Sequence, residues 1–418
     1  MKINLLLCAA IFAPGVLLSA QHATAIPTPL PILVAEAEAN NSDVATADDN
    51  WKAQTHVAQQ ASARPETQLS VESFDVGSPK PFAGYSNSEF AYTGFGASQE
   101  LLYSGKLKLR GAVASREAEA QKAAVGVVRS SVAEQVKLLY LQIAYSTSAI
   151  SYLDRTDSVL QTLIQDALSR YSVGQGSQSA ILKAQLERTE IVRQDTMHNE
   201  ILGQSQARIK QLLHRTQDSP DIVPEPLTET MFMKDIEELQ SQLRAQNPRL
   251  AVDAAAEARQ DAQVASAKRE GKPDFTVGGR IEVTGSGYRN RYWMGGTIEL
   301  PNRSRVAGEV AQATEQANRA RHEMDSEVQK TLAELQEQYV ALMSTTELLK
   351  EYTQGLLPQA EAVFHSEQSA YQANKEELTP VLASLRDVLS LENDYQQTLF
   401  DHEAALVRME TLTGEALR

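Results

Sequence analysis

The sequence predicts a mainly α protein with a small β part, in which a unit of helix, β-hairpin, long helix and shorter helix occurs twice. Residues 40–103 and 110–214 resemble, in order and spacing, residues 247–301 and 306–414. We therefore assign residues 34–219 to a first repeat, 220–235 to a linker and 236–418 to a second repeat. Near the end of each repeat the match has no gap, and equivalent residues stand 200 positions apart: Tyr171 and Tyr371, Ser179 and Thr379, Leu182 and Leu382, Leu212 and Leu412.

The first residues have the pattern of an export signal. Lys2 precedes an apolar stretch over residues 5–18, and the small residues of 23–25 suit a cleavage site, so we expect residues 1–25 to be a signal peptide. Cys8 is the only cysteine and lies inside it, so the rest of the chain offers no disulfide and no thiolate. Residues 26–33 contain three prolines and are expected to form an extended arm, with a disordered linker as the alternative.

The charge balance is acidic, with a formal net charge of −15. A nucleic-acid partner needs a basic surface, so this balance argues against one. It suits a surface or lumen that tolerates cations. Beyond the signal peptide no run of about 18 apolar residues occurs, so we expect no transmembrane helix, although an exported chain can still span a membrane as a β-barrel.

Each repeat begins with a helix and continues into a hairpin. The first helices are expected at about 34–63, weakened by the polar stretch 40–49, and at 236–270. Pro65 and Pro273 then end them. The hairpins are expected at about 67–101 and 275–300.

The second hairpin alternates clearly between apolar and polar residues. The alternation fits a tilted membrane-spanning strand, although an ordinary hairpin of a soluble domain remains the alternative. The first hairpin alternates less cleanly, because Phe74 and Phe95 break its pattern. Four strands would leave open edges in lipid, so a membrane location requires several chains to pool their strands. The candidate lipid-facing residues are Phe275, Val277, Ile281 and Val283.

Two very long helices follow the hairpins, at about 105–171 and 305–371. Sixty-six helical residues extend roughly 100 Å, far more than a small globular domain needs. Shorter helices return at about 179–214 and 379–413, and the apolar spacing of the last one indicates coiled-coil packing. The connecting turns contain Gly174 and Asn374, residues that readily adopt the positive φ angle found at helix C-termini.

The sequence contains no recognisable catalytic motif. No histidine outside residues 1–25 is spaced as one of a metal-ligand pair, and we find no phosphate-binding glycine loop, nucleophile-elbow serine or zinc-protease motif. We therefore expect no enzyme, no cofactor and no metal site.

Several motifs together resemble the outer-membrane efflux proteins of the TolC type, over roughly residues 35–414. They are residues 170–177 (RYSVGQGS) with 181–184 (ILKA), residues 273–275 (PDF) opening a strand, and residues 298–305 (IELPNRSR) leading into a long helix with Ala307, Ala311 and Ala317. The resemblance implies a homotrimer with a twelve-stranded outer-membrane β-barrel, continued by a coiled-coil helical tunnel in the periplasm. The 302–305 junction favours the heavy-metal branch of the family, associated with pumps of the RND type.

By this resemblance the chain is a passive, gated duct that carries small molecules or ions from the periplasm to the outside. It is expected to serve a tripartite efflux pump or a type I secretion system. The implied partners are a periplasmic adaptor (a membrane fusion protein), an inner-membrane pump of the RND, ABC or MFS type, and outer-membrane lipid. A soluble periplasmic coiled-coil scaffold or adaptor is the alternative, and it requires hairpins outside the membrane.

The resemblance also selects residues at the tips of the helical hairpins. Many members carry aspartates after the second tip turn, where this chain has Pro380 and Ala383. The nearby acidic residues Glu376, Glu377 and Asp387 are therefore the candidates for ringing the aperture and attracting cations, with solvated surface charges as the alternative. The expected adaptor-contacting residues are Tyr171, Val173, Gly174 and Ser179 in the first repeat, and Tyr371, Asn374 and Thr379 in the second.

Overall fold

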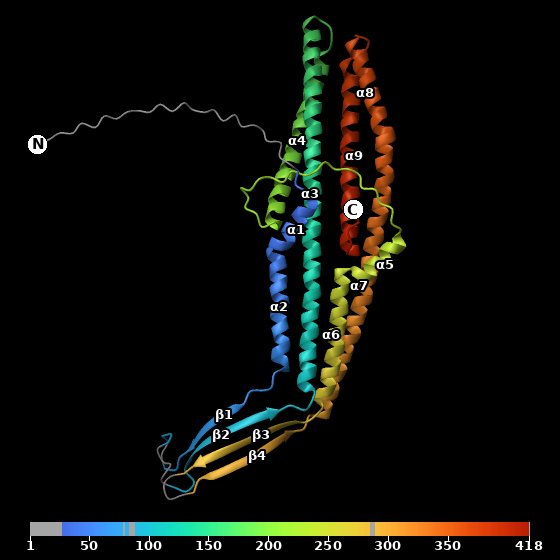
Figure 1. The fold of residues 1–418 in the computed structure, drawn as a ribbon. Coiled ribbons are helices and arrows are strands. Elements are labelled where there is room, and N and C mark those ends of the chain that lie inside the picture. The colour runs from blue at the N-terminus through green and yellow to red at the C-terminus, as the bar shows by residue number, and fades with distance from the viewer. Residues whose placement is uncertain (1–26, 78–79, 83–87, 285–288, 418) are drawn as a thin grey trace, which may run out of the picture.

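The computed structural model describes residues 27–77, 80–82, 88–284 and 289–417. The expected signal peptide lies outside this part. Figure 1 shows a long, narrow molecule with a β-sheet at one end and the tips of two helical hairpins at the other.

The first repeat consists of α1 (Leu30–Asn40), α2 (Ser42–Ser62), β1 (Gln68–Phe74), β2 (Tyr92–Leu101), α3 (Lys106–Ser172) and α4 (Gln178–Leu212). The second consists of α5 (Ile236–Gln246), α6 (Pro248–Glu270), β3 (Asp274–Val283), β4 (Arg291–Glu299), α7 (Arg303–Glu351), a π-helical turn (Tyr352–Leu356), α8 (Leu357–Gln372) and α9 (Leu378–Thr413).

The expected extended arm over residues 26–33 is wrong from Leu30 onward, where α1 begins. Pro31 is tolerated because it occupies the first turn, where a backbone N–H has no partner within the helix. Leu33 and Ala37 are fully buried in a cluster with Val136 of α3, so apolar burial stabilises this short helix.

The first helix of each repeat is divided in two by a buried asparagine. Asn41 separates α1 from α2, and its side chain accepts from the N–H groups of Asp43 and Val44 at 2.8 and 3.3 Å. Asn247 does the same between α5 and α6, where we expected one continuous helix. Their amides donate to carbonyls at equivalent places, from Asn41 to Leu212 at 3.1 Å and from Asn247 to Leu412 at 2.8 Å. Each asparagine therefore caps one helix and binds the end of another.

The two hairpins form one antiparallel sheet in the order β1-β2-β3-β4. The first repeat joins the second through β2 and β3, where Phe95 lies opposite Ile281 and, on its other side, opposite Val71. The expectation that Phe95 breaks the alternation is therefore wrong, since it shares a face with these apolar residues. Phe74 lies on the opposite face and stacks on Tyr92 with ring centroids 5.9 Å apart.

The long helices differ between the repeats. Helix α3 runs unbroken over 67 residues. Its counterpart, expected to be continuous, contains the π-helical turn just before Pro358. Proline lacks the N–H of the helical ladder and clashes with the carbonyl four residues earlier, and the wider π turn accommodates it.

Among the residues that the structure describes, three apolar clusters hold the helices together. The largest lies in the tip half, among α3, α4, α8 and α9. The other two lie near the middle of the molecule, one in each repeat. The linker crosses this middle region, and the Thr230 N–H donates to Glu403 of α9 at 2.8 Å. Among the described residues, no helix is both long and apolar enough to cross a membrane.

Candidate functional site

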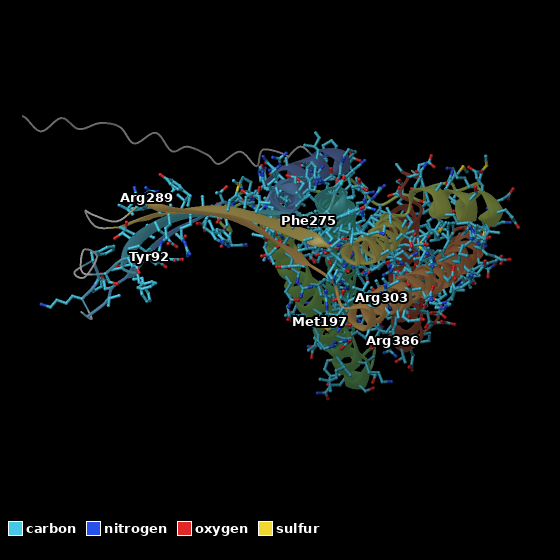
Figure 2. All side chains as sticks on the ribbon, turned by 90° about the horizontal axis from the view of Figure 1, so that it is seen from below. Tyr92, Met197, Phe275, Arg289, Arg303 and Arg386 are labelled. Carbon is cyan, nitrogen blue, oxygen red and sulfur yellow. The ribbon has the colours of Figure 1, made fainter. Side chains whose placement is uncertain are left out.

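One face of the sheet is apolar and open. Phe275, Val277, Ile281 and Val283 share this face because they alternate along β3, and the first three are 38%, 47% and 47% exposed. Figure 2 shows that the sheet projects away from the helices. Neighbouring strands extend the apolar face with Leu69, Val71, Phe95, Tyr292, Met294 and Ile298.

The opposite face of the sheet carries a network of charges. Arg280 contacts Glu72 and Glu282, each at 2.7 Å, and Arg291 contacts Glu282 at 3.0 Å. The ring of Tyr92 lies beside both guanidinium groups, with 5.7 and 5.4 Å from each guanidinium carbon to the ring centroid. The two faces therefore suit different surroundings, one apolar and one aqueous.

The sheet has two open edges. In the described part of the chain, β1 pairs only with β2, and β4 pairs only with β3. Each outer strand therefore presents backbone N–H and C=O groups without partners, which is a template for pairing with another chain.

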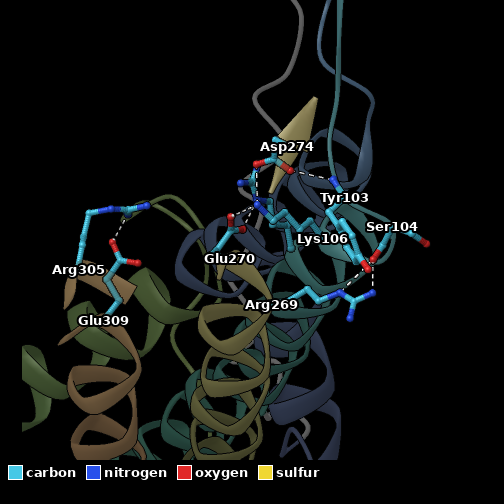
Figure 3. A network of polar contacts seen from close by, with 9 residues as sticks. Tyr103, Ser104, Lys106, Arg269, Glu270, Asp274, Arg305 and Glu309 are labelled. Carbon is cyan, nitrogen blue, oxygen red and sulfur yellow. Dashed lines mark hydrogen bonds and ion pairs between the residues drawn. The ribbon is translucent and has the colours of Figure 1, made fainter. Parts of the chain in front are cut away.

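A polar network joins the sheet to the long helices (Figure 3). Lys106, in the first turn of α3, has a side chain only 2% exposed, and its Nζ lies 2.6 Å from Asp274 and 3.4 Å from Glu270. The other oxygen of Asp274 accepts from the Tyr103 N–H at 2.8 Å. This one lysine therefore binds the end of α6 and the start of β3 to the start of α3.

Two arginines complete the joint. Arg110 donates to Glu270 at 2.9 Å. Burial alone would raise the pKa of Glu270, but the hydrogen bond and charges of Arg110 and Lys106 outweigh it, and the net pKa is lowered. Arg269 donates to the Ser104 carbonyl at 3.0 Å and lies over the Tyr103 ring at 4.9 Å.

The tip turns place most of the expected adaptor-contacting residues at the surface. Gly174 and Asn374 adopt φ angles of 78° and 56°, so each ends a long helix in the left-handed conformation. Tyr171 and Val173 are 47% and 71% exposed. Ser179 is exposed and Thr379 half-buried, each in the first turn of its helix. Tyr371 is the exception, because it is only 5% exposed.

Arg170 covers Tyr371 and links the two tips. Its guanidinium lies over the Tyr371 ring at 4.3 Å and donates to the carbonyls of Tyr371 and Gln372 at 2.9 and 3.4 Å. It also donates to the side chain of Asn374. Burial, together with the charge of Asp166, raises the pKa of Tyr371. Sequence reasoning quoted Arg170 only as part of a motif, because a contact across 200 residues leaves no local signal.

The acidic candidates lie in two places. Glu376 and Glu377 are exposed in the second tip turn and line a groove of about 520 Å³ together with Arg170. Asp387 is exposed farther along α9 and does not line this groove. No cluster of three or more potential metal ligands occurs within the residues that the structure describes.

Comparison with known proteins gives a family-model match for the second repeat and a shared fold for nearly the whole chain. Residues 239–415 match the family model described as Outer membrane efflux protein. The outer-membrane channel OprN superposes with a TM-score of 0.80 at 16% identity, covering 92% of this chain and 89% of that one. The outer membrane protein VceC from Vibrio cholerae gives 0.77 at 16%, covering 93% and 97%. The CmeC channel of Campylobacter jejuni gives 0.75 at 14%, covering 93% and 86%. No curated protein sequence matches the chain.

These superpositions confirm the predicted fold class. Identities of 14–16% support the fold alone, and the superposed part covers 92–93% of this chain. The duplicated helix–hairpin–long helix–helix unit is thus the fold of outer-membrane channel proteins.

Proposed function

We propose that three copies of this chain form one passive, gated export duct, on the premise that residues 239–415 match the outer membrane efflux protein family. Its barrel lies in the outer membrane and its helices extend through the periplasm. The proposed cargo is small molecules or ions moving from the periplasm to the outside.

The observation that carries this proposal is a sheet with an exposed apolar face and two open edges. One copy contributes four strands, and three copies contribute twelve. Pairing β1 of each copy with β4 of the next would close the ring and satisfy both edges, as lipid requires. The apolar face would then meet lipid, and the charged face with Arg280 and Glu282 would line the water-filled interior.

The helical part supports the remainder of the proposal. We propose that the exposed tip residues, Tyr171, Val173, Gly174, Ser179, Asn374 and Thr379, contact a periplasmic adaptor. Buried Tyr371 supports the tip instead of presenting its ring. Energy for export would come from an inner-membrane pump of the RND, ABC or MFS type, and the duct itself would catalyse no reaction. A soluble scaffold is disfavoured because it would leave the apolar sheet face in water.

The test is to reconstitute purified protein into planar lipid bilayers and to fractionate the cells that produce it. We expect stepwise conductance, outer-membrane fractionation and a trimer that resists SDS without heating. Recovery of the protein only as a soluble periplasmic monomer without conductance would contradict the proposal.

Charge at the tips gives a first prediction. If Glu376 and Glu377 ring the closed aperture, the double variant Glu376→Gln/Glu377→Gln should weaken block by trivalent cations applied from the periplasmic side. Three copies would lose six carboxylates from one level of the duct, which removes the attraction that holds the blocker. The measurement is the blocking constant in single-channel recordings. Glu347→Gln, at an exposed position on α7 outside the groove, serves as the control. An unchanged blocking constant in the double variant would remove Glu376 and Glu377 from the aperture.

A further inference from the structure

The charged face of the sheet carries a large aromatic side chain that is open to water. Trp293 of β4 lies opposite Arg280 of β3, so it shares a face with the charge network and not with the apolar residues. Its side chain is 55% exposed. Aromatic residues of membrane barrels gather on the lipid side, which is the face that Tyr292 occupies. An exposed indole on the opposite face therefore has to be explained by something other than lipid.

The backbone beside the indole is shaped to receive it. Gly295 follows two residues later on the same face of β4, and it pairs with Gly278 of β3. A β-carbon added to Gly295 would lie 2.7 Å from Cη2 of Trp293 and closer still to Cζ2, so no larger residue fits beneath the ring. The indole thus leans along the strand over bare backbone. One side of the ring rests on the sheet, and the other side stays accessible.

The Trp293 ring has no cation of its own. In the described part of the chain, arginine or lysine side chains lie over other rings, those of Trp51, Tyr92, Tyr103, Tyr152 and Tyr371. Arg280 lies directly opposite Trp293, but its guanidinium is held beside Tyr92 and by the two glutamates of the charge network. Tryptophan binds cations better than the other aromatic residues do. The indole can therefore receive a positive charge that a ligand brings.

Two acidic side chains lie on the same face, between Trp293 and the helices. Glu100 of β2 lies opposite Thr276, which alternation places on the charged face. Glu299 of β4 lies four residues beyond Gly295 and points to the same side. Both glutamates are exposed. Exposed carboxylates raise the local concentration of cations, so a cationic ligand is favoured on this face over an anionic one.

We propose that Trp293 is a stacking site for planar aromatic cations inside the duct. The flat ring of the ligand lies on the accessible side of the indole, and the field of Glu100 and Glu299 favours its positive charge. The site rests on the proposed function, because the charged face lines the interior only when copies of the chain close a barrel. Each copy would contribute one such site, so cargo of this chemistry would pause at one level of the barrel on its way out.

The experiment measures the binding of two flat probes to full-length trimers in detergent. Ethidium is a planar aromatic cation, and phenanthridine is its parent ring, uncharged at neutral pH. Ethidium binding is followed by fluorescence anisotropy, and phenanthridine binding by its displacement of ethidium. Trp293→Ala should weaken ethidium binding roughly tenfold, because one stacking and cation–π partner is lost. Phenanthridine should bind more weakly than ethidium, and Glu100→Gln/Glu299→Gln should reduce the difference between them.

A matched pair of glycine substitutions tests the position of the indole. Gly295→Ala should push the ring off the sheet and weaken ethidium binding about as much as Trp293→Ala does. Gly279→Ala adds the same methyl group to the apolar face of β3, where the nearest atom would be an ordinary 3.4 Å away. It should leave ethidium binding unchanged.

The outcomes separate the site from the duct. Conducting trimers that bind ethidium equally well with and without Trp293 would overturn the site and leave the duct intact. Equal binding of the two probes to the unmodified protein would overturn the preference for cations. Gly279→Ala weakening binding as much as Gly295→Ala would show that the indole does not need the bare backbone beneath it. A protein that neither forms trimers nor conducts would contradict the duct, and the site inside it would be lost with it.

Discussion

Replacing Lys106 with methionine should lower the free energy of unfolding by about 3–5 kcal/mol, the usual cost of removing one partner from a buried ion pair. The variant keeps most of the apolar stem but leaves Asp274 without its 2.6 Å partner in a site where the lysine is 2% exposed. The sheet and the helices would lose their direct link at the same point. The measurement is denaturant unfolding of the detergent-solubilised protein, followed by tryptophan fluorescence, since Trp51 and Trp293 are the two tryptophans, one in α2 and one in β4.

A matched control lies two residues farther along the same helix. Lys108 is exposed in the first turns of α3, and Lys108→Met should change stability by no more than about 0.5 kcal/mol. A Lys106→Met variant as stable as the Lys108→Met variant would show that the joint does not depend on the buried cation.

Replacing Arg170 with alanine should shift the duct toward its open state. The guanidinium donates to two carbonyls at the end of α8 and to Asn374, and it covers Tyr371. Hydrogen bonds from a charged group contribute about 1.5–3 kcal/mol, so their loss should change the ratio of closed to open tips by roughly 10- to 100-fold in each chain. The measurement is the open probability and mean conductance of single channels in a planar bilayer.

Two further variants distinguish the effect of the Arg170 hydrogen bonds from the effect of its positive charge. Arg170→Lys keeps the positive charge but cannot make the fork of bonds, so it should open the duct nearly as much as alanine. Arg193 pairs with Glu190 on its own helix, so Arg193→Ala should leave gating unchanged. An open probability of Arg170→Ala equal to that of the unmodified protein would show that the Arg170 contacts do not hold the duct closed.

Local patterns in the sequence predicted the parts of the fold that depend on local periodicity. Alternation placed Phe275, Val277 and Ile281 on one face, where the structure has them, and the uninterrupted helical pattern predicted the length of α3. The division at Asn247 was missed because the surrounding residues favour helix, and the break depends on a carbonyl supplied by Leu412.

The joint and the tip link were beyond sequence reasoning for a physical reason. Lys106 and Asp274 are 168 residues apart, and Arg170 and Tyr371 are 201 apart. Such contacts exist only after the helices and strands have packed, and no sequence pattern near either contacting residue predicts them. The choice of Glu376, Glu377 and Asp387 as aperture residues stays a prediction.

The π-helical turn lies in the longer of the two helical arms. In the second repeat α7, the turn and α8 contain 49, 5 and 16 residues, together 70, whereas α3 contains 67. A single π turn accommodates about one extra residue by local underwinding, without breaking the helix. The two hairpin tips still meet through Arg170 and Tyr371, even though one arm is longer. A gene duplicated in this way can therefore accumulate small insertions in one half while the geometry shared by both halves is preserved.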